Sequence, residues 1–195
     1  MKINNKISNL FNKSTLDVAK NLLGAYLVRS TSKEKIIGKI VETEAYLFDD
    51  AASHSYKGLS ERNKAMFDNP GRAYVYLVYG MYECFNCTTN KKGVGEAVLI
   101  RALEPVFGIE KMKRNRRCDD IKNLCSGPGK LTSALGITRK DNFCDLTSAK
   151  SRLRIEIPSK KEKFSIVKAK RIGITKGVSL LYRFYIKDNQ FVSKK

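Results

Sequence analysis

The sequence predicts a single α+β domain, in which a largely antiparallel or mixed β-sheet carries a few peripheral helices. Segments rich in β-branched and aromatic residues recur along the whole chain, and some are joined by turns short enough for hairpins. Between them lie short segments with helix-capping residues and helical spacing of apolar side chains. At 195 residues, the chain has the length of one domain that buries a substantial core.

The first third of the chain predicts helices from capping residues and strands from alternation. Ser14 or Thr15 can cap a helix that Gly24 closes, and the turn at 69–71 ends a second, shorter helix. Residues 1–13 and 193–195 are expected to be flexible ends of the domain, which spans 1–195. The predicted elements are a helix over 14–24, strands over 25–28 and 35–47, and a short helix over 61–67.

A tyrosine-rich hairpin is predicted over residues 73–90, with its tip at Tyr79-Gly80. Tyr74, Tyr76, Tyr79 and Tyr82 all lie in this segment. A tyrosine ring is large and flat, and its hydroxyl needs water or a hydrogen-bond partner. Rings at a hairpin tip are badly placed for a core and well placed to meet a flat partner molecule.

The rest of the chain alternates between helix and strand signals. Pro105 suits the first turn of a helix through 104–117, and Pro128 opens a helix that Gly136 closes. The apolar segment before the first of these helices predicts a strand over 95–103. Further strands are predicted over 153–158, 169–175, 179–186 and 190–193.

The charge balance points to a polyanion as partner. Lys and Arg number 38 against 19 Asp and Glu, a formal net charge of +19. Such an excess favours nucleic acid, and an acidic membrane is the lesser option because no long apolar run is present. The N-terminus lacks the apolar core of a signal peptide, and the five cysteines are odd in number and scattered, so a cytoplasmic protein with reduced thiols is expected. No cofactor or metal site is predicted, because Cys84 and Cys87 of CFNC would point to opposite faces of a strand.

The segment VETEAY carries the strongest chemical signal. On a strand, Glu42, Glu44 and Tyr46 share one face. Paired carboxylates can act as acid and base or hold a divalent metal, and they can equally be a solvated edge. Arg101 lies among apolar neighbours and needs a carboxylate, either Glu44 or Glu104. We expect the guanidinium to lower the pKa of that carboxylate and keep it ionised, which makes a general base.

An ordered series of motifs adds a family resemblance. VETEAY, AASH, ERNKAMFDNPG, YVYLVYGMYECFN, RALEP and LCSGPGKL occur in that order, and residues 14–192 resemble the alkylpurine (3-methyladenine) DNA glycosylases. The resemblance implies a base-excision repair enzyme that hydrolyses the N-glycosidic bond of damaged purines in duplex DNA. 3-Methyladenine is the expected substrate, with hypoxanthine and ethenoadenine as further candidates. It also implies a curved sheet with a protruding hairpin that inserts into DNA, and a monomer without an obligate protein partner.

The resemblance also implies roles for individual residues. Glu44 is the general base, and its water is also held by Arg101 and by the main-chain carbonyl of Ile172. Tyr79 is the wedge that fills the gap left in the duplex. The remaining positions form the base pocket: Tyr46 and His54 on one side of the base, Tyr76 on the other, and Asn86, which disfavours the exocyclic amine of guanine. The family often has A-A-H where this chain has A-S-H, so the chain departs from the family pattern in the motif that gives His54 its place in the pocket.

Two other classes of function compete with the glycosylase. A non-catalytic basic nucleic-acid-binding protein explains the charge and the tyrosines, and leaves Glu44 and Arg101 without a role. A metal-dependent nuclease built on Glu42 and Glu44 needs more acidic ligands than one strand supplies, and chelation would abolish its activity.

Overall fold

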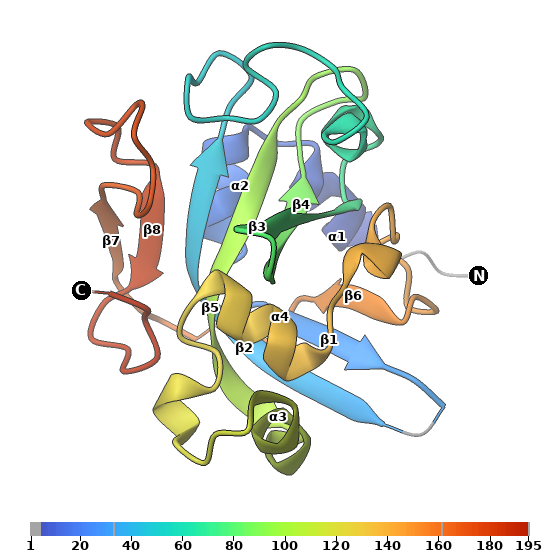
Figure 1. The fold of residues 1–195 in the computed structure, drawn as a ribbon, viewed down its shortest axis with the longest axis vertical. Helices are drawn as coiled ribbons and strands as arrows, with labels where there is room; N and C mark the ends of the chain where they lie inside the picture. The colour runs from blue at the N-terminus through green and yellow to red at the C-terminus, as the bar shows by residue number, and fades with distance from the viewer. Residues whose placement is uncertain (1–4, 33, 161, 195) are drawn as a thin grey trace.

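The computed structural model describes residues 5–32, 34–160 and 162–194 (Figure 1). The helices are α1 (Asn5–Phe11), α2 (Thr15–Asn21), α3 (Ile109–Arg116) and α4 (Pro128–Leu135), with 3₁₀ turns η1 (Lys64–Phe67), η2 (Ile121–Asn123) and η3 (Arg139–Asp141). The strands are β1 (Tyr26–Ser30), β2 (Lys35–Tyr46), β3 (Ala73–Val78), β4 (Tyr82–Thr88), β5 (Ala97–Phe107), β6 (Leu153–Glu156), β7 (Ile166–Ala169) and β8 (Arg183–Ile186).

The strands form one curled antiparallel sheet, which confirms the predicted α+β class. Their order is β3-β4-β5-β2-β1-β6, and β8 pairs with both β2 and β7. The pairing of β2 with β5 shifts register near Gly38 and again near Glu42, and such irregularities bend and twist a sheet. Because β4 pairs with β5 and β8 pairs with β2, the β3–β4 hairpin and the β7–β8 pair lie on opposite sides of the β2–β5 pair, as Figure 1 shows.

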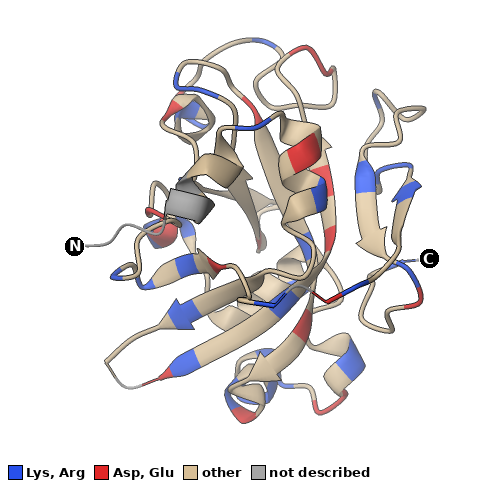
Figure 2. Cartoon of the chain, turned by 180° about the vertical axis from the view of Figure 1, so that it is seen from behind, with Lys and Arg blue, Asp and Glu red and all other residues tan. Residues whose placement is uncertain are grey.

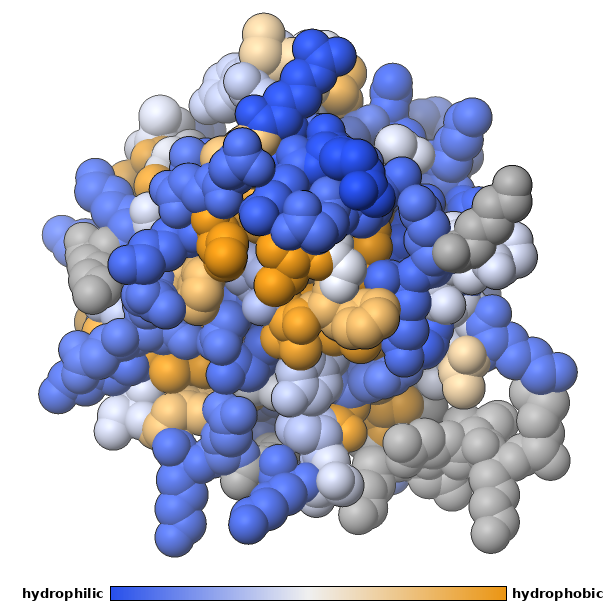
Figure 3. Space-filling view, turned by 90° about the horizontal axis from the view of Figure 1, so that it is seen from below, coloured by the Kyte–Doolittle hydropathy of each residue, from blue (hydrophilic) through white to orange (hydrophobic). Residues whose placement is uncertain are grey.

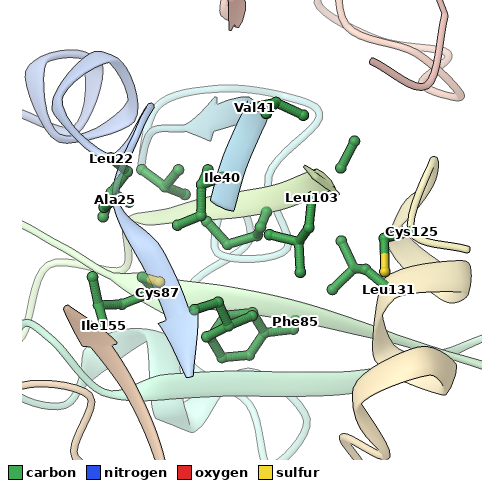
Figure 4. Close-up of a cluster of buried hydrophobic side chains, with 14 of the residues drawn as sticks. Leu22, Ala25, Ile40, Val41, Phe85, Cys87, Leu103, Cys125, Leu131 and Ile155 are labelled. Atoms are coloured by element: carbon green, nitrogen blue, oxygen red, sulfur yellow. The ribbon is translucent and has the colours of Figure 1, made fainter. Parts of the chain in front are cut away.

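One hydrophobic core joins the sheet to the helices. Phe85 of β4, Leu103 of β5 and Leu131 of α4 are fully buried and lie in one cluster (Figure 4). The same cluster extends from Ile7 near the N-terminus to Val192 near the C-terminus, and a second, smaller cluster joins Met66 of η1 to Tyr74 of β3. None of the described helices is long and apolar enough to cross a membrane.

The surface carries the excess of positive charge on most elements of the chain, and Figure 2 shows Lys and Arg on strands as well as loops. The face at the α3 end differs, because apolar side chains gather there among hydrophilic ones (Figure 3). Val106 and Phe107, at the end of β5, are exposed and line a shallow depression beside α3.

The prediction of a helix beginning at Pro105 is wrong, because β5 continues to Phe107 and α3 starts only at Ile109. Pro105 pairs with Gly38 next to a register shift, where a strand tolerates a residue without an N–H group. Gly108 separates strand from helix at φ 76°, and a Cβ there would lie 2.7 Å from the Lys35 carbonyl oxygen. Glycine is therefore required at this junction.

Other predicted elements are shorter than expected or absent. In place of the helix expected over 61–67, only the 3₁₀ turn η1 forms. Of the strand expected over 169–175, only Ala169 lies in a strand, as the last residue of β7. Residues 190–193 form no strand; Phe191 and Val192 instead bury their side chains in the core. A short apolar segment does not by itself distinguish a strand from a turn that packs on the core.

Helix α1 falls within residues 1–13, which were expected to be flexible. Ile7 and Phe11 are buried, and the Phe11 carbonyl accepts a hydrogen bond from the Asn90 N–H at 3.0 Å. The Phe11 ring also packs closely on Gly71. Residues 1–4 lie outside the described part of the chain.

We therefore predict that Phe11→Ala lowers the free energy of unfolding by about 3–5 kcal/mol, the usual cost of truncating a buried phenylalanine. Urea denaturation of the purified variant measures it. Phe48→Ala is the matched control, because Phe48 is 57% exposed and its truncation should change stability by less than about 1 kcal/mol. Equal, small effects of both variants would show that α1 does not pack on the core.

Candidate active site

A cavity of about 450 Å³ opens beside the β3–β4 hairpin. This volume is in the range of pockets that hold a small organic molecule. Its walls come from the hairpin, from the ends of β2 and β5, and from the loops around 51–54 and 172–176. Most of the residues that the sequence proposes for the site line it: Tyr46, His54, Tyr76, Tyr79, Asn86, Arg101 and Ile172.

Glu44 lies beneath this cavity and is fully buried. At Glu44, strand β2 pairs with β5 on one side and with β8 on the other. One carboxylate oxygen, Oε1, accepts the Ile172 N–H at 2.8 Å, and Oε2 accepts the Tyr46 hydroxyl at 2.8 Å. Arg101 Nη1 lies 3.4 Å from Oε1. Three donors from three separate segments therefore converge on one carboxylate.

Burial raises the pKa of Glu44 above the ordinary value for a glutamate. Arg101, the Ile172 N–H and the Tyr46 hydroxyl oppose the shift and do not reverse it. The expectation that Arg101 would hold this pKa low is therefore wrong, since removing the carboxylate from water outweighs the guanidinium. The alternative that Glu42 and Glu44 form a solvated edge is also wrong, because both are fully buried.

Glu42 has a different set of partners. Its Oε1 accepts Arg183 Nη1 at 2.8 Å and its Oε2 accepts the Ser193 N–H at 2.7 Å. Arg101 Nε lies 3.4 Å away. Glu42 therefore ties β8 and the C-terminal segment to β2, and it does not line the cavity. The described residues contain no group of three or more His, Cys, Asp or Glu that could hold a metal ion.

Arg101 is buried between the two glutamates and also lines the cavity. Of its two candidate partners in the sequence, Glu44 is the one in contact. Glu104 instead binds Lys39 at 3.0 Å and the Asn189 side chain at 3.0 Å.

The aromatic residues form a connected group around the cavity. The rings of His54 and Tyr76 meet edge to face with centroids 4.5 Å apart, and His54 Nδ1 bonds to the Tyr74 hydroxyl at 2.9 Å. His54 therefore stands beside Tyr76 and not across from it, which differs from the arrangement that the resemblance implies. Partial burial, and then the neighbouring Arg62, lower the pKa of His54, so its ring is neutral at pH 7.

Tyr46 forms another part of the wall. Burial, and then the nearby Glu44, raise the pKa of its phenol, so the hydroxyl stays protonated and donates to Glu44. Asn86 is buried next to Tyr74, and its Nδ2 donates to the Tyr74 carbonyl at 3.1 Å. Asn86 thus both pairs with main chain and lines the cavity.

Tyr79 lies at the hairpin tip with 81% of its surface exposed. It adopts a φ of 51°, in the left-handed region, and Gly80 follows at 70°. Positive φ at both central residues suits a tight hairpin turn, but for a tyrosine it costs roughly 1–2 kcal/mol. Strand β3 ends at Val78, so Tyr79 belongs to the turn and not to the strand. The turn, and not the strand pleat, directs the exposed ring.

Sequence reasoning missed a buried ion pair that holds the site together. Arg171 bonds to the Asp50 carboxylate, with Nη2 to Oδ1 at 3.0 Å, and Nη1 donates to the Ala45 carbonyl at 2.9 Å. Its guanidinium lies over the Tyr46 ring, 4.6 Å from the centroid. This pair fixes both the Tyr46 wall and the main chain that presents the Ile172 N–H.

A family model described as methylpurine-DNA glycosylase (MPG) matches residues 9–190. A relative from Francisella tularensis subsp. tularensis (strain SCHU S4 / Schu 4), named "Putative 3-methyladenine DNA glycosylase", is 48% identical over 192 residues, which are 98% of this chain and 100% of the relative. Relatives with the same name come from Carboxydothermus hydrogenoformans, 51% identical over 183 residues (94% of this chain, 95% of the relative), and from Clostridium tetani, 49% identical over 208 residues (100% of both).

The buried ion pair allows two adjacent aspartates to be compared. We predict that Asp50→Asn destabilises the fold by about 3–5 kcal/mol, because it leaves the Arg171 guanidinium buried without its counter-charge. Asp49→Asn is the control, since Asp49 is exposed and its loss should cost less than about 1 kcal/mol. Thermal and urea unfolding of both variants measure this, and similar stabilities would contradict the role given to Arg171.

Proposed function

The chain belongs to the methylpurine-DNA glycosylase family, and we propose that it releases damaged purines from duplex DNA with a water molecule activated by Glu44. The proposed substrates are 3-methyladenine and also hypoxanthine and ethenoadenine. The observation that carries this proposal is Glu44 itself, a buried carboxylate beneath a cavity of about 450 Å³, with both oxygens bound to donors.

In the proposed reaction, water attacks the C1′ atom of the sugar as the bond from C1′ to the purine nitrogen breaks. The sugar acquires oxocarbenium character, as in glycoside hydrolysis. Ionised Glu44 accepts the water proton and stabilises the developing positive charge. Arg101 and the main-chain carbonyl of Ile172 are the proposed further contacts of that water. No lysine nucleophile is needed, so we propose hydrolysis without strand cleavage.

The damaged nucleotide must leave the double helix before the cavity can hold it, at a cost of a few kcal/mol in stacking and pairing. We propose that Tyr79 fills the vacated place, which fits its exposed position on the hairpin tip. In the cavity, the base would stack against Tyr46 and Tyr76, with His54 supporting Tyr76 from its edge. Asn86 would disfavour the exocyclic amine of guanine.

The excess of positive charge supports DNA as the partner, since Lys and Arg release counterions from phosphates on binding. We propose a monomer that acts on DNA in the cytoplasm without an obligate protein partner. One cavity with its own carboxylate in each chain is sufficient for the reaction.

The test of the proposal is release of free 3-methyladenine from methylated duplex DNA in the presence of EDTA. Base release under these conditions supports a glycosylase over both alternatives, because a binding protein releases no base and a metal-dependent nuclease is inhibited. Binding of this DNA by the wild type without any release of base would refute the proposal.

Glu44→Gln should lower the single-turnover rate of base release by about 10²–10⁴-fold, the range for loss of a general base, while lesion binding is retained. Glu104→Gln is the matched control, since Glu104 lies on the neighbouring strand and pairs with Lys39. The control should keep the wild-type rate. Wild-type release by Glu44→Gln would remove Glu44 as the base.

Tyr79→Ala should weaken binding to lesion-containing duplex about tenfold or more relative to undamaged duplex, because aromatic stacking on a base is worth about 1–3 kcal/mol. Met81→Ala is the control from the same turn, as Met81 is exposed as well. Competition titrations with the two duplexes give the ratio. Equal weakening on both duplexes would make Tyr79 an ordinary surface contact.

A further inference from the structure

Arg62 lies at the cavity and has no role in the reaction described so far. It precedes η1, it lines the cavity, and its guanidinium carbon is 5.6 Å from the centroid of the Tyr76 ring. Tyr74 packs against the same ring at 5.2 Å and is buried, whereas Arg62 is exposed. The guanidinium therefore approaches Tyr76 from the solvent side, where a base would enter.

The guanidinium of Arg62 has no carboxylate partner among the residues that the structure describes. The adjacent Glu61 pairs with Lys64 at 2.7 Å, and no carboxylate within the described ranges forms an ion pair with Arg62. The two buried arginines of the site differ in this respect, because Arg101 contacts Glu44 and Arg171 contacts Asp50. Arg62 thus places at the cavity a guanidinium that has no carboxylate partner.

The main chain at Arg62 is held in place by its neighbour Asn63, which is buried. Asn63 Nδ2 donates to the carbonyls of His54 and Gly58, both at 2.9 Å. Its Oδ1 accepts the Ser60 N–H at 2.7 Å. The main chain at Arg62 is therefore bonded to the segment that carries His54, and the guanidinium itself contacts the Tyr76 ring.

On the basis of the proposed function, we propose that Arg62 determines lesion specificity by favouring neutral purines with acceptors at O6 and N7, such as hypoxanthine, over cationic purines. The planar guanidinium matches these two acceptors, which is the geometry that arginine uses to bind the same edge of guanine. A cationic methylpurine is repelled by the same charge, which offsets its attraction to the tyrosine rings.

The charge also acts on the leaving group. When the glycosidic bond breaks, its electron pair stays on the purine, while the water oxygen bonds to C1′ and the water proton passes to Glu44. A neutral purine becomes negative in this step, and a guanidinium at O6 and N7 stabilises that charge. A cationic purine becomes neutral and gains nothing from Arg62.

The experiment compares single-turnover release of hypoxanthine and of 3-methyladenine from matched duplexes by wild type, Arg62→Gln and Arg62→Lys. For Arg62→Gln we expect the hypoxanthine rate constant to fall roughly tenfold or more, as for loss of a charged hydrogen bond, with 3-methyladenine release unchanged or faster. Arg62→Lys keeps the positive charge but lacks the planar guanidinium. Its rate constant for hypoxanthine release should therefore lie between those of wild type and Arg62→Gln. Lys57→Gln, on the same exposed loop, removes one charge and should leave the ratio of the two rate constants unchanged.

An equal loss on both lesions, together with a shallower salt dependence of binding, would overturn the inference and make Arg62 a phosphate contact. A ratio in Arg62→Gln equal to that of wild type would overturn it as well. Neither result affects the proposed function, which fails separately if the wild type releases neither base.

Discussion

The site depends on the burial of one carboxylate. Glu44 is removed from water by the sheet on both sides, and an ionised carboxylate in that position is tolerated only with donors on its oxygens. The Tyr46 hydroxyl, the Ile172 N–H and Arg101 supply them. Because burial still raises the pKa of Glu44, the carboxylate accepts a proton more readily than an exposed glutamate would. The same burial that makes the residue costly to the fold makes it suitable as a base.

The fold provides these donors from segments far apart in the sequence. The bend in the β2–β5 pair places Glu44 and Arg101 side by side, and the β8 side brings the 170–176 segment over the cavity. The Arg171–Asp50 pair then joins that segment to the loop after β2 and packs on Tyr46. The hairpin carries Tyr76 at the cavity and Tyr79 out into solvent, where its strained turn holds the ring away from the core.

Local patterns in the sequence predicted the α+β class, the hairpin with its tip and helix α2, and they named Glu44 as one of two candidate partners of Arg101. They failed where a tertiary contact decided the outcome. Pro105 has the signature of a helix start, and its pairing beside a bulge keeps it in β5. Helix α1 is short, with no acidic residue in its first turn and no basic residue in its last, and its burial of Phe11 stabilises it. The pKa of Glu44 could not be predicted because desolvation depends on strands that pair from the far end of the chain. No local pattern distinguishes Arg171 from other charged residues, because its partner Asp50 lies 121 residues away in the sequence.

The most direct test of the central claim is the pH dependence of single-turnover release of 3-methyladenine, a lesion whose positive charge does not change with pH in this range. A base must be ionised, so the rate should fall as pH decreases through the pKa of Glu44, with a midpoint above the ordinary glutamate value of 4.5. The midpoint should be absent from the residual activity of Glu44→Gln. A wild-type rate that stays constant through the acid range, or an identical midpoint in the variant, would contradict the account.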